Sequence, residues 1–343
     1  MSILTYKLRH DRDFSEQLRQ AKSLAEFAIA NRKCRSSKDV RQFGLPSAVS
    51  NQVLRKYGRN RKARGVRNAN LCVPGQSLKL NGNTLKIRCL GLELPFDRKV
   101  EKVLQAEVGK EFVFVSCQVK DAEPVQTVGW IGIDRNSTGH LVVCALPDGK
   151  VMKLGARACH VSKKYRAIRK RLQKLGKTKR LKKIRRRESN IVREINHKVS
   201  SDIMKLAIKN NWGIKLENLK GIRKTTKQRR NPKTEKQKKD KAVLHSWPFH
   251  QFGTFVEYKA KLLGLPVAHV APQYTSKGCA RCGLLGIRDK KRFKCPHCGH
   301  VEHADANAAF NIALRPAMVS MTRSGGEWVP PEGNSDIPRL ATA

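Results

Sequence analysis

Hydrophobic and polar positions alternate through much of the first third of the chain. Residues 3–8 and 111–120 alternate as strands do, and residues 76–96 alternate on both sides of an Asn-Gly-Asn turn. Residues 14–31 and 47–63 instead place apolar side chains at helical spacing. These patterns predict a mostly β module over residues 1–125 with inserted helices.

The hydrophobic pattern changes after residue 125. Three short apolar runs in residues 128–154 predict a β-meander, and apolar positions at helical spacing through residues 168–203 predict a long helix pair. A short buried strand, a helix over residues 247–264, another strand and an alanine-rich helix follow. A meander followed by alternating helices and strands is typical of a ribonuclease H-like α/β fold, in which helices flank a mixed sheet.

Two segments lack a regular period. Residues 222–241 are almost wholly polar and basic and are interrupted by Asn-Pro, so they predict a flexible loop. The residues after Arg315 predict a disordered tail.

The net charge of the chain indicates which class of molecule it binds. The chain of 343 residues has 72 Lys and Arg against 27 Asp and Glu, a net charge of +45, which favours a polyanion such as nucleic acid. Residues 163–187 have 15 Lys or Arg and no acid. Solvated helix faces would also explain such a run, but phosphate neutralisation relieves the mutual repulsion and makes binding strongly salt-dependent. The predicted nucleic-acid contacts are Lys163, Lys164, Arg166, Arg169, Lys170, Arg171, Arg185, Arg186, Arg187, Arg229 and Arg230.

Targeting signals for a membrane are not found in the sequence. It has neither a long apolar span nor a lipidation motif, and its first residues lack the apolar core of a signal peptide. We therefore expect a cytoplasmic, nucleoid-associated protein without a membrane partner. Six cysteines stand singly, without the spacing of a disulfide framework, and are interpreted as reduced packing residues.

The other four cysteines form a pattern typical of a metal site. Cys279, Cys282, Cys295 and Cys298 are spaced C-x2-C-x12-C-x2-C, so each short loop presents two thiolates to one tetrahedral Zn²⁺. A redox dithiol and unrelated cysteines are the alternatives, but two pairs at this spacing favour a zinc ribbon. Four thiolates leave no open position for water, so one structural zinc ion is predicted. The histidines at positions 297, 300 and 303 are expected to be exposed.

Three acids stand at the ends of predicted elements. Asp134 and Glu217 end strands, and Asp305 begins the last helix. Each has a simpler explanation: a turn residue, a solvated acid before a Gly turn, and a helix N-cap. Acids are rare in this half of the chain, however, and these three converge if the elements share one sheet. Converging carboxylates hold two Mg²⁺ ions that hydrolyse phosphodiesters, so the three acids predict nucleic-acid cleavage.

The motifs around these residues resemble those of one family. GIDRN contains Asp134, KLENLKG contains Glu217, YTSKGCARCG and KCPHCGH contain the cysteines, and HADANAAFNIA contains Asp305. In this order they resemble the TnpB proteins, transposon-encoded RNA-guided DNA endonucleases related to the miniature type V CRISPR effectors. The motifs that carry the resemblance lie within residues 128–314. Over residues 1–125 the resemblance rests only on the alternation of predicted strands and helices. HAD stands where the family often has Asp-Arg-Asp, and the chain is short for the family.

The resemblance implies a RuvC-like nuclease in which Asp134, Glu217 and Asp305 are catalytic and bind Mg²⁺. It implies a wedge-like β-barrel with an inserted helical recognition lobe over residues 1–125. The nuclease then occupies residues 126–270 and 303–316, the zinc ribbon 271–302, and the tail 317–343. A guide RNA from the transposon end would select double-stranded DNA, and the protein would read a short adjacent motif. We expect a prokaryotic host, and the ribbon is expected to guide single-stranded DNA to the acids.

Other functions remain open at this point. A guided repressor that has lost cleavage would be expected to lack one of the acids. A transposase that joins DNA strands fits the same fold and the same acids. A basic RNA-binding protein with a zinc ribbon leaves the three acids unexplained. Whether the protein acts as a monomer or a dimer on RNA is also open.

Overall fold

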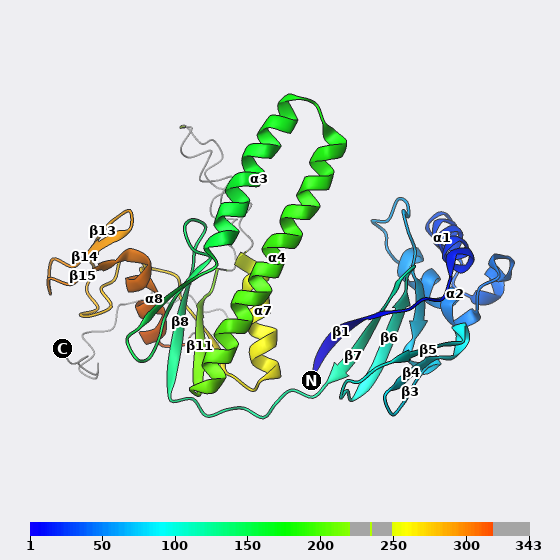
Figure 1. Ribbon diagram of the computed structural model, residues 1–343, viewed down its shortest axis with the longest axis horizontal. Coiled ribbons are helices and arrows are strands. Elements are labelled where there is room, and N and C mark those ends of the chain that lie inside the picture. The colour runs from blue at the N-terminus through cyan, green and yellow to red at the C-terminus, as the bar shows by residue number, and fades with distance from the viewer. Residues whose placement is uncertain (220–233, 235–248, 318–343) are drawn as a thin grey trace. The chain divides into compact units, whose positions relative to one another are not determined.

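The computed structural model describes residues 1–219, 234 and 249–317 of the chain, which forms two compact units, Met1–Asp121 and Ala122–Ala343 (Figure 1). The predicted contacts Arg229 and Arg230 lie outside the described residues. So do the predicted flexible loop, apart from residue 234, and nearly all of the predicted tail.

The first unit contains two antiparallel sheets. One has four strands in the order β1-β7-β6-β2 and the other three in the order β3-β4-β5. The strands are β1 (Ser2–Arg9), β2 (Leu71–Pro74), β3 (Leu78–Asn81), β4 (Thr84–Ile87), β5 (Leu92–Pro95), β6 (Lys102–Val108) and β7 (Phe112–Val119). Because these strands pair as two separate sheets, the barrel closure implied by the resemblance remains a prediction.

The predicted helices lie between β1 and β2, as an insertion in the β module. They are α1 (Ser15–Ala30), η1 (Ser37–Phe43), α2 (Ser47–Val53) and η2 (Leu54–Gly58). Helix α1 buries Ala21, Leu24, Ala25 and Ala28, one stripe of a 3.6-residue period. The helix predicted over residues 47–63 ends at Gly58 because its last turn widens into the π-helix η2. Strands β2 and β6 have no counterpart among the predicted elements.

The second unit is built on a five-stranded mixed sheet in the order β10-β9-β8-β11-β12. Strands β8, β9 and β10 form the predicted antiparallel meander, and β11 and β12 extend it in parallel with β8. The strands are β8 (Gly129–Arg135), β9 (Val142–Ala145), β10 (Val151–Leu154), β11 (Trp212–Glu217) and β12 (Val267–Val270). This is a mixed α/β unit, as the sequence predicts.

Helices cover both faces of this sheet (Figure 1). On one face, Ile131, Ile133, Ile214 and Leu216 pack with the helices α4 and α7 into the main core. On the other face, α8 packs on β8, β9 and β11. The helices are α3 (Ala156–Lys174), α4 (Thr178–Lys209), α7 (Phe249–Leu262) and α8 (Ala304–Leu314). Alternation along β8 and β11 thus decides which side chains meet α8.

The helix α8 lies unusually close to β8 at Gly132. A Cβ added there would lie 2.1 Å from the Ala309 carbonyl oxygen and 2.5 Å from the Ala313 amide nitrogen. These are backbone atoms and cannot rotate away. The glycine two residues before Asp134 is therefore required for α8 to dock.

We expect Gly132→Ala to destabilise the second unit by about 3 kcal/mol, because α8 must shift to admit the methyl group. Urea unfolding would measure this loss. Gly65→Ala is the control, since no atom lies within 4 Å of the added Cβ. Equal stability of the two variants would contradict the close packing.

Lys215 fixes the C-terminal end of α8. Its ammonium donates hydrogen bonds to the carbonyl oxygens of Ala313, at 2.8 Å, and Arg315, at 2.6 Å. These carbonyls have no partner within the helix, and a cation also suits the negative end of the helix dipole. Lys215 lies in β11, on the same face as Gly132 of β8, so two neighbouring strands contact α8 from the same face of the sheet.

Candidate functional site

Asp134 and Glu217 stand on neighbouring strands at the same edge of the sheet. The parallel register pairs Ile131 with Ile214 and Ile133 with Leu216, so the next residues, Asp134 and Glu217, follow on adjacent strands. Both point to the α8 face, since each follows by two positions a residue packed beneath α8. Both are buried, with 9% and 8% of their surface exposed.

Asp305 reaches the site from the first turn of α8 and is 3% exposed. It is not the N-cap of this helix. His303 occupies that position, and its Nδ1 accepts a hydrogen bond from the Asp305 amide at 3.3 Å. The expectation that His303 is simply exposed is wrong: it is partly buried and caps the helix. The Asp305 side chain is thereby left for other contacts.

Asp134 is in an unfavourable place for a charge. Burial, together with the carboxylates of Glu217 and Asp305, raises the pKa of Asp134 to about 7, although a hydrogen bond from the Asn136 amide opposes this rise. That amide donates to Asp134 Oδ2 at 3.0 Å. Glu217 and Asp305 therefore both lie near enough to Asp134 to act on it electrostatically.

Glu217 is held by two hydrogen-bond donors from other elements. The Thr275 hydroxyl donates to Oε1 at 2.5 Å, and the Arg135 guanidinium donates to the backbone carbonyl. Burial raises the pKa of Glu217, while Thr275 and the charges of Arg135 and Arg315 lower it. Arg135 also donates to the carbonyl of Phe249, so it joins the ends of β8 and β11 to the start of α7.

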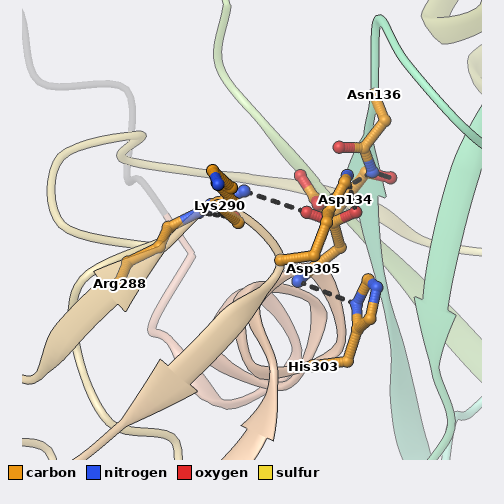
Figure 2. A network of polar contacts seen from close by, with 7 residues as sticks. Asp134, Asn136, Arg288, Lys290, His303 and Asp305 are labelled. Carbon is orange, nitrogen blue, oxygen red and sulfur yellow. Dashed lines mark hydrogen bonds and ion pairs between the residues drawn. The ribbon is translucent and has the colours of Figure 1, made fainter.

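Asp305 is paired with two cations from the hairpin between the cysteine pairs, and Figure 2 labels one of them, Arg288, beside Asp305. The Arg288 guanidinium lies 3.0 Å from Oδ1, and the Lys291 ammonium pairs with Oδ2. Two charge-assisted bonds to one buried carboxylate fix its orientation. Sequence analysis missed both cations, because only the folded hairpin brings them to α8.

The raised pKa of Asp134 has a consequence for stability. The folded protein retains this proton above the ordinary pKa of 3.8, whereas the unfolded chain releases it there. The contribution of protonated Asp134 to the unfolding free energy is therefore complete below pH 3.8, and it is lost as the pH rises toward about 7. The size of the Asp134 pKa shift limits this contribution to the unfolding free energy to about 4 kcal/mol.

We expect the unfolding free energy, without added divalent ions, to fall between about pH 4 and about pH 7. Asp134→Asn should flatten this slope, as urea unfolding across that range would measure. Asp148→Asn, which changes an exposed acid in the β9–β10 turn, should retain the slope. If the unfolding free energy of the wild type does not fall over this pH range, the pKa of Asp134 is not raised in the folded protein.

The three acids suit a hard divalent cation in their chemistry. Mg²⁺ prefers carboxylate oxygens, and its charge would relieve the repulsion that raises the Asp134 pKa. Asp134, Glu217 and Asp305 would hold it. Among the described residues these acids are not as tightly grouped as the cysteines, since Asp305 is drawn to Arg288 and Lys291. A cation at this site would compete with those two side chains for Asp305.

The four predicted cysteines form a tight cluster. All four sulfur atoms lie within 4.8 Å of one another, with Cys279 and Cys298 at 3.6 Å and Cys282 and Cys295 at 3.5 Å. A tetrahedral zinc with Zn–S bonds of about 2.3 Å places its sulfurs about 3.8 Å apart, so the cluster fits Zn²⁺. The surrounding sheet consists of β13 (Ile287–Asp289), β14 (Arg292–Lys294) and β15 (Val301–His303).

The basic segment forms the hairpin of α3 and α4 (Figure 1). Eight of the nine described residues predicted to contact nucleic acid are exposed there: Lys163, Lys164, Arg166, Lys170, Arg171, Arg185, Arg186 and Arg187. Arg169 differs, because it is partly buried and pairs with Glu188 across the hairpin. The apolar stripe packs inward as predicted except for Leu175, which is 55% exposed beyond the end of α3.

A second basic surface lies in the first unit and was not predicted. A cavity of about 1060 Å³ lies among α2, η2 and the β2–β3 connection. Its lining includes no acid but includes six cations, Arg32, Arg35, Arg55, Arg59, Arg61 and Lys102. The signal was present in the sequence as arginines around residues 55–61, within the predicted helix.

Comparison with known proteins shows which families the chain is similar to. Residues 249–312 match the family described as Cas12f1-like, TNB domain. The TnpB-like protein MJ0751 of Methanocaldococcus jannaschii is 36% identical over 166 residues, 48% of this chain and 57% of that protein. These matches support the resemblance of the chain to the TnpB proteins and the miniature type V effectors. This confirms the resemblance stated from the motifs.

Other relatives of the chain are named as nucleases. The CRISPR-associated endodeoxyribonuclease Cas12f1 of Sulfoacidibacillus thermotolerans is 33% identical over 146 residues, 40% of this chain and 31% of that protein. The matches thus span about half the length of MJ0751 and about a third of that Cas12f1.

Solved structures align over more of the chain. A Cas12f1–sgRNA–target DNA complex aligns over 92% of this chain and 99% of that one, with a TM-score of 0.43 and 18% identity. A CRISPR-Cas12f ternary complex aligns over 89% and 82%, with a TM-score of 0.44 and 16% identity. In the described part of the chain, no helix has the length and apolar character needed to cross a membrane.

Proposed function

We propose that this protein is an RNA-guided DNA endonuclease of a transposable element, which hydrolyses phosphodiester bonds at Asp134, Glu217 and Asp305. One observation carries the proposal. Three buried acids from β8, β11 and α8 meet at one edge of the sheet, and two of them have raised pKa values. The carboxylates of such a site repel one another, and bound divalent cations would relieve this repulsion.

The proposed fold of the second unit is ribonuclease H-like. Its support is the antiparallel meander β8–β10, extended by two strands parallel to β8, with helices on both faces. In this arrangement the central strand carries Asp134 and the adjacent strand carries Glu217, so the sheet itself sets the spacing of two acids.

The chain's own residues prepare the site. Thr275 and Asn136 orient Glu217 and Asp134, while Arg288 and Lys291 orient Asp305. Two Mg²⁺ ions, when bound, would activate the attacking water and stabilise the leaving oxygen. The four cysteines would hold one structural Zn²⁺, whose site is closed by thiolates.

The proposed nucleic-acid partners are a guide RNA from the transposon end and a double-stranded DNA target with a short adjacent motif. Two basic surfaces support this, the exposed cations of the α3–α4 hairpin and the arginine-lined cavity of the first unit. Both attract phosphates without regard to base sequence, so base pairing with a guide would supply the specificity.

The decisive experiment is purification after co-expression with the DNA flanking the gene. Bound RNA would be sequenced, and the complex would be incubated with Mg²⁺ and a plasmid library that matches the RNA. We expect cutting of matched plasmids only, with a mismatched library as control. Bound RNA without cutting would favour a guided repressor, and strand-transfer products without RNA would favour a transposase.

A further inference from the structure

Glu217 depends on a hydroxyl from outside the sheet. Thr275 lies in the turn between β12 and Cys279 and is 3% exposed. Its hydroxyl can donate to Glu217 Oε1 at 2.5 Å or to the Pro272 carbonyl oxygen at 3.1 Å. A hydroxyl has one proton, and the carboxylate is the closer and stronger acceptor. Thr275 therefore orients Glu217 so that one oxygen is occupied and the rotamer is set.

Thr275 is held in place by α8. The Asn311 amide donates to the carbonyl oxygens of Thr275, at 2.8 Å, and Gly278, at 2.7 Å. Asn311 is buried, with 8% of its surface exposed. The turn that carries Thr275 is thus fastened to the helix that carries Asp305.

The same helix also holds the first pair of cysteines. Asn307 is fully buried; its amide donates to the Gly278 carbonyl oxygen at 2.7 Å, and its Oδ1 accepts from the Ala280 amide at 2.9 Å. Ala280 stands between Cys279 and Cys282. Helix α8 therefore connects three things: Asp305, the first cysteine loop and the turn with Thr275.

We propose that Thr275 is a positioning residue, which sets Glu217 for divalent-metal binding and is itself held by Asn311 of α8. The zinc ribbon and the metal site then share one hydrogen-bonded frame. This inference rests on the proposed function for its meaning in cleavage. The positioning of Glu217 for a metal can nevertheless be measured without any cleavage.

The test compares Thr275→Val with Thr275→Ser in the full-length chain with zinc bound. Valine keeps the shape of the side chain and removes the donor, whereas serine keeps the donor. Mn²⁺ affinity would be measured by calorimetry, with Glu217→Gln as the reference for a lost ligand. We expect Thr275→Val to weaken Mn²⁺ binding by about 10- to 100-fold, the usual effect of losing a partner that orients a ligand. Thr275→Ser should restore nearly wild-type affinity.

A matched control is Thr254→Val, which removes an exposed hydroxyl that bonds only within α7. It should bind Mn²⁺ as the wild type does. Wild-type Mn²⁺ affinity in Thr275→Val would overturn the proposal, and so would a loss that serine does not restore. If Thr275→Val fails to retain zinc or fold, Thr275→Ala replaces it under the same criteria.

The position of Thr275 in the frame is tested with Asn311→Asp, which keeps the size of the side chain and removes the amide donor. We expect it to weaken Mn²⁺ binding by about tenfold while zinc content is retained. Unchanged affinity would remove Asn311 from the proposal. If the wild type binds Mn²⁺ with the expected pattern but never cuts guided DNA, the proposed function fails and the positioning role stands.

Discussion

Asp134→Asn is expected to lower guide-dependent DNA cutting by about a thousandfold or more, equivalent to about 4 kcal/mol in activation free energy. Asp134 is the acid of the central strand, next to Glu217 and under the electrostatic influence of Asp305. Asparagine has the same shape but no charge, so it would remove the proposed metal ligand without opening a cavity. Single-turnover cutting of a matched plasmid would measure the loss.

The binding of RNA and DNA should survive this change. The exposed cations of the α3–α4 hairpin lie outside the acid site, and Asp134→Asn alters none of them. The folded protein should also become more stable near neutral pH, since the variant removes a buried charge. Asp148→Asn is the control and should cut as the wild type does. Robust cutting by Asp134→Asn would exclude this acid from catalysis.

The second large effect is expected from the cysteine cluster. Cys295→Ser should abolish zinc binding and unfold the ribbon, because the ribbon's own buried cluster consists only of Cys279, Phe293, Cys295 and Ala304. So small a core cannot replace a structural zinc, whose binding contributes about 10 kcal/mol or more in small zinc domains. Zinc analysis and limited proteolysis would measure the result.

Loss of the folded ribbon should also remove contacts that orient the acids. Arg288 and Lys291 would no longer be delivered to Asp305, and the turn with Thr275 would lose its attachment. We therefore expect cutting to fall by about a hundredfold or more, in line with loss of the groups that orient metal ligands. Cys89→Ser, in the first unit, is the control. A zinc-free Cys295→Ser chain that still cuts normally would separate the ribbon from the site.

Much of the second unit follows from local pattern. Apolar runs of strand length predicted β8 and β11, and helical spacing predicted α3, α4, α7 and α8. In the first unit β2 and β6 were missed. Strand β2 is only four residues long and its first three residues are all buried, and β6 contains a register shift, which breaks strict alternation. The π-helix η2 likewise shortened a predicted helix that had no glycine or proline signal before Gly58.

The candidate site was only partly predictable. The acids and cysteines are visible because few residue types bind metals, and their spacing limits the alternatives. Asn307 and Asn311 offered a further signal, since two amides four residues apart in an alanine-rich helix must find partners if buried. Thr275, Arg288 and Lys291 offered no such signal, because threonine and basic residues are common in this chain.

The sequence by itself determined the candidate ligand residues, the four-cysteine cluster, the basic hairpin and the resemblance to the TnpB proteins. These depend on short spacings, composition and helical periodicity, which are local properties of the chain. Only the tertiary structure decided that Asp305 pairs with Arg288 and Lys291, that Thr275 orients Glu217 and that α8 docks on Gly132. Each of these contacts joins separate elements, so it depends on strand register and helix packing, which no local spacing encodes.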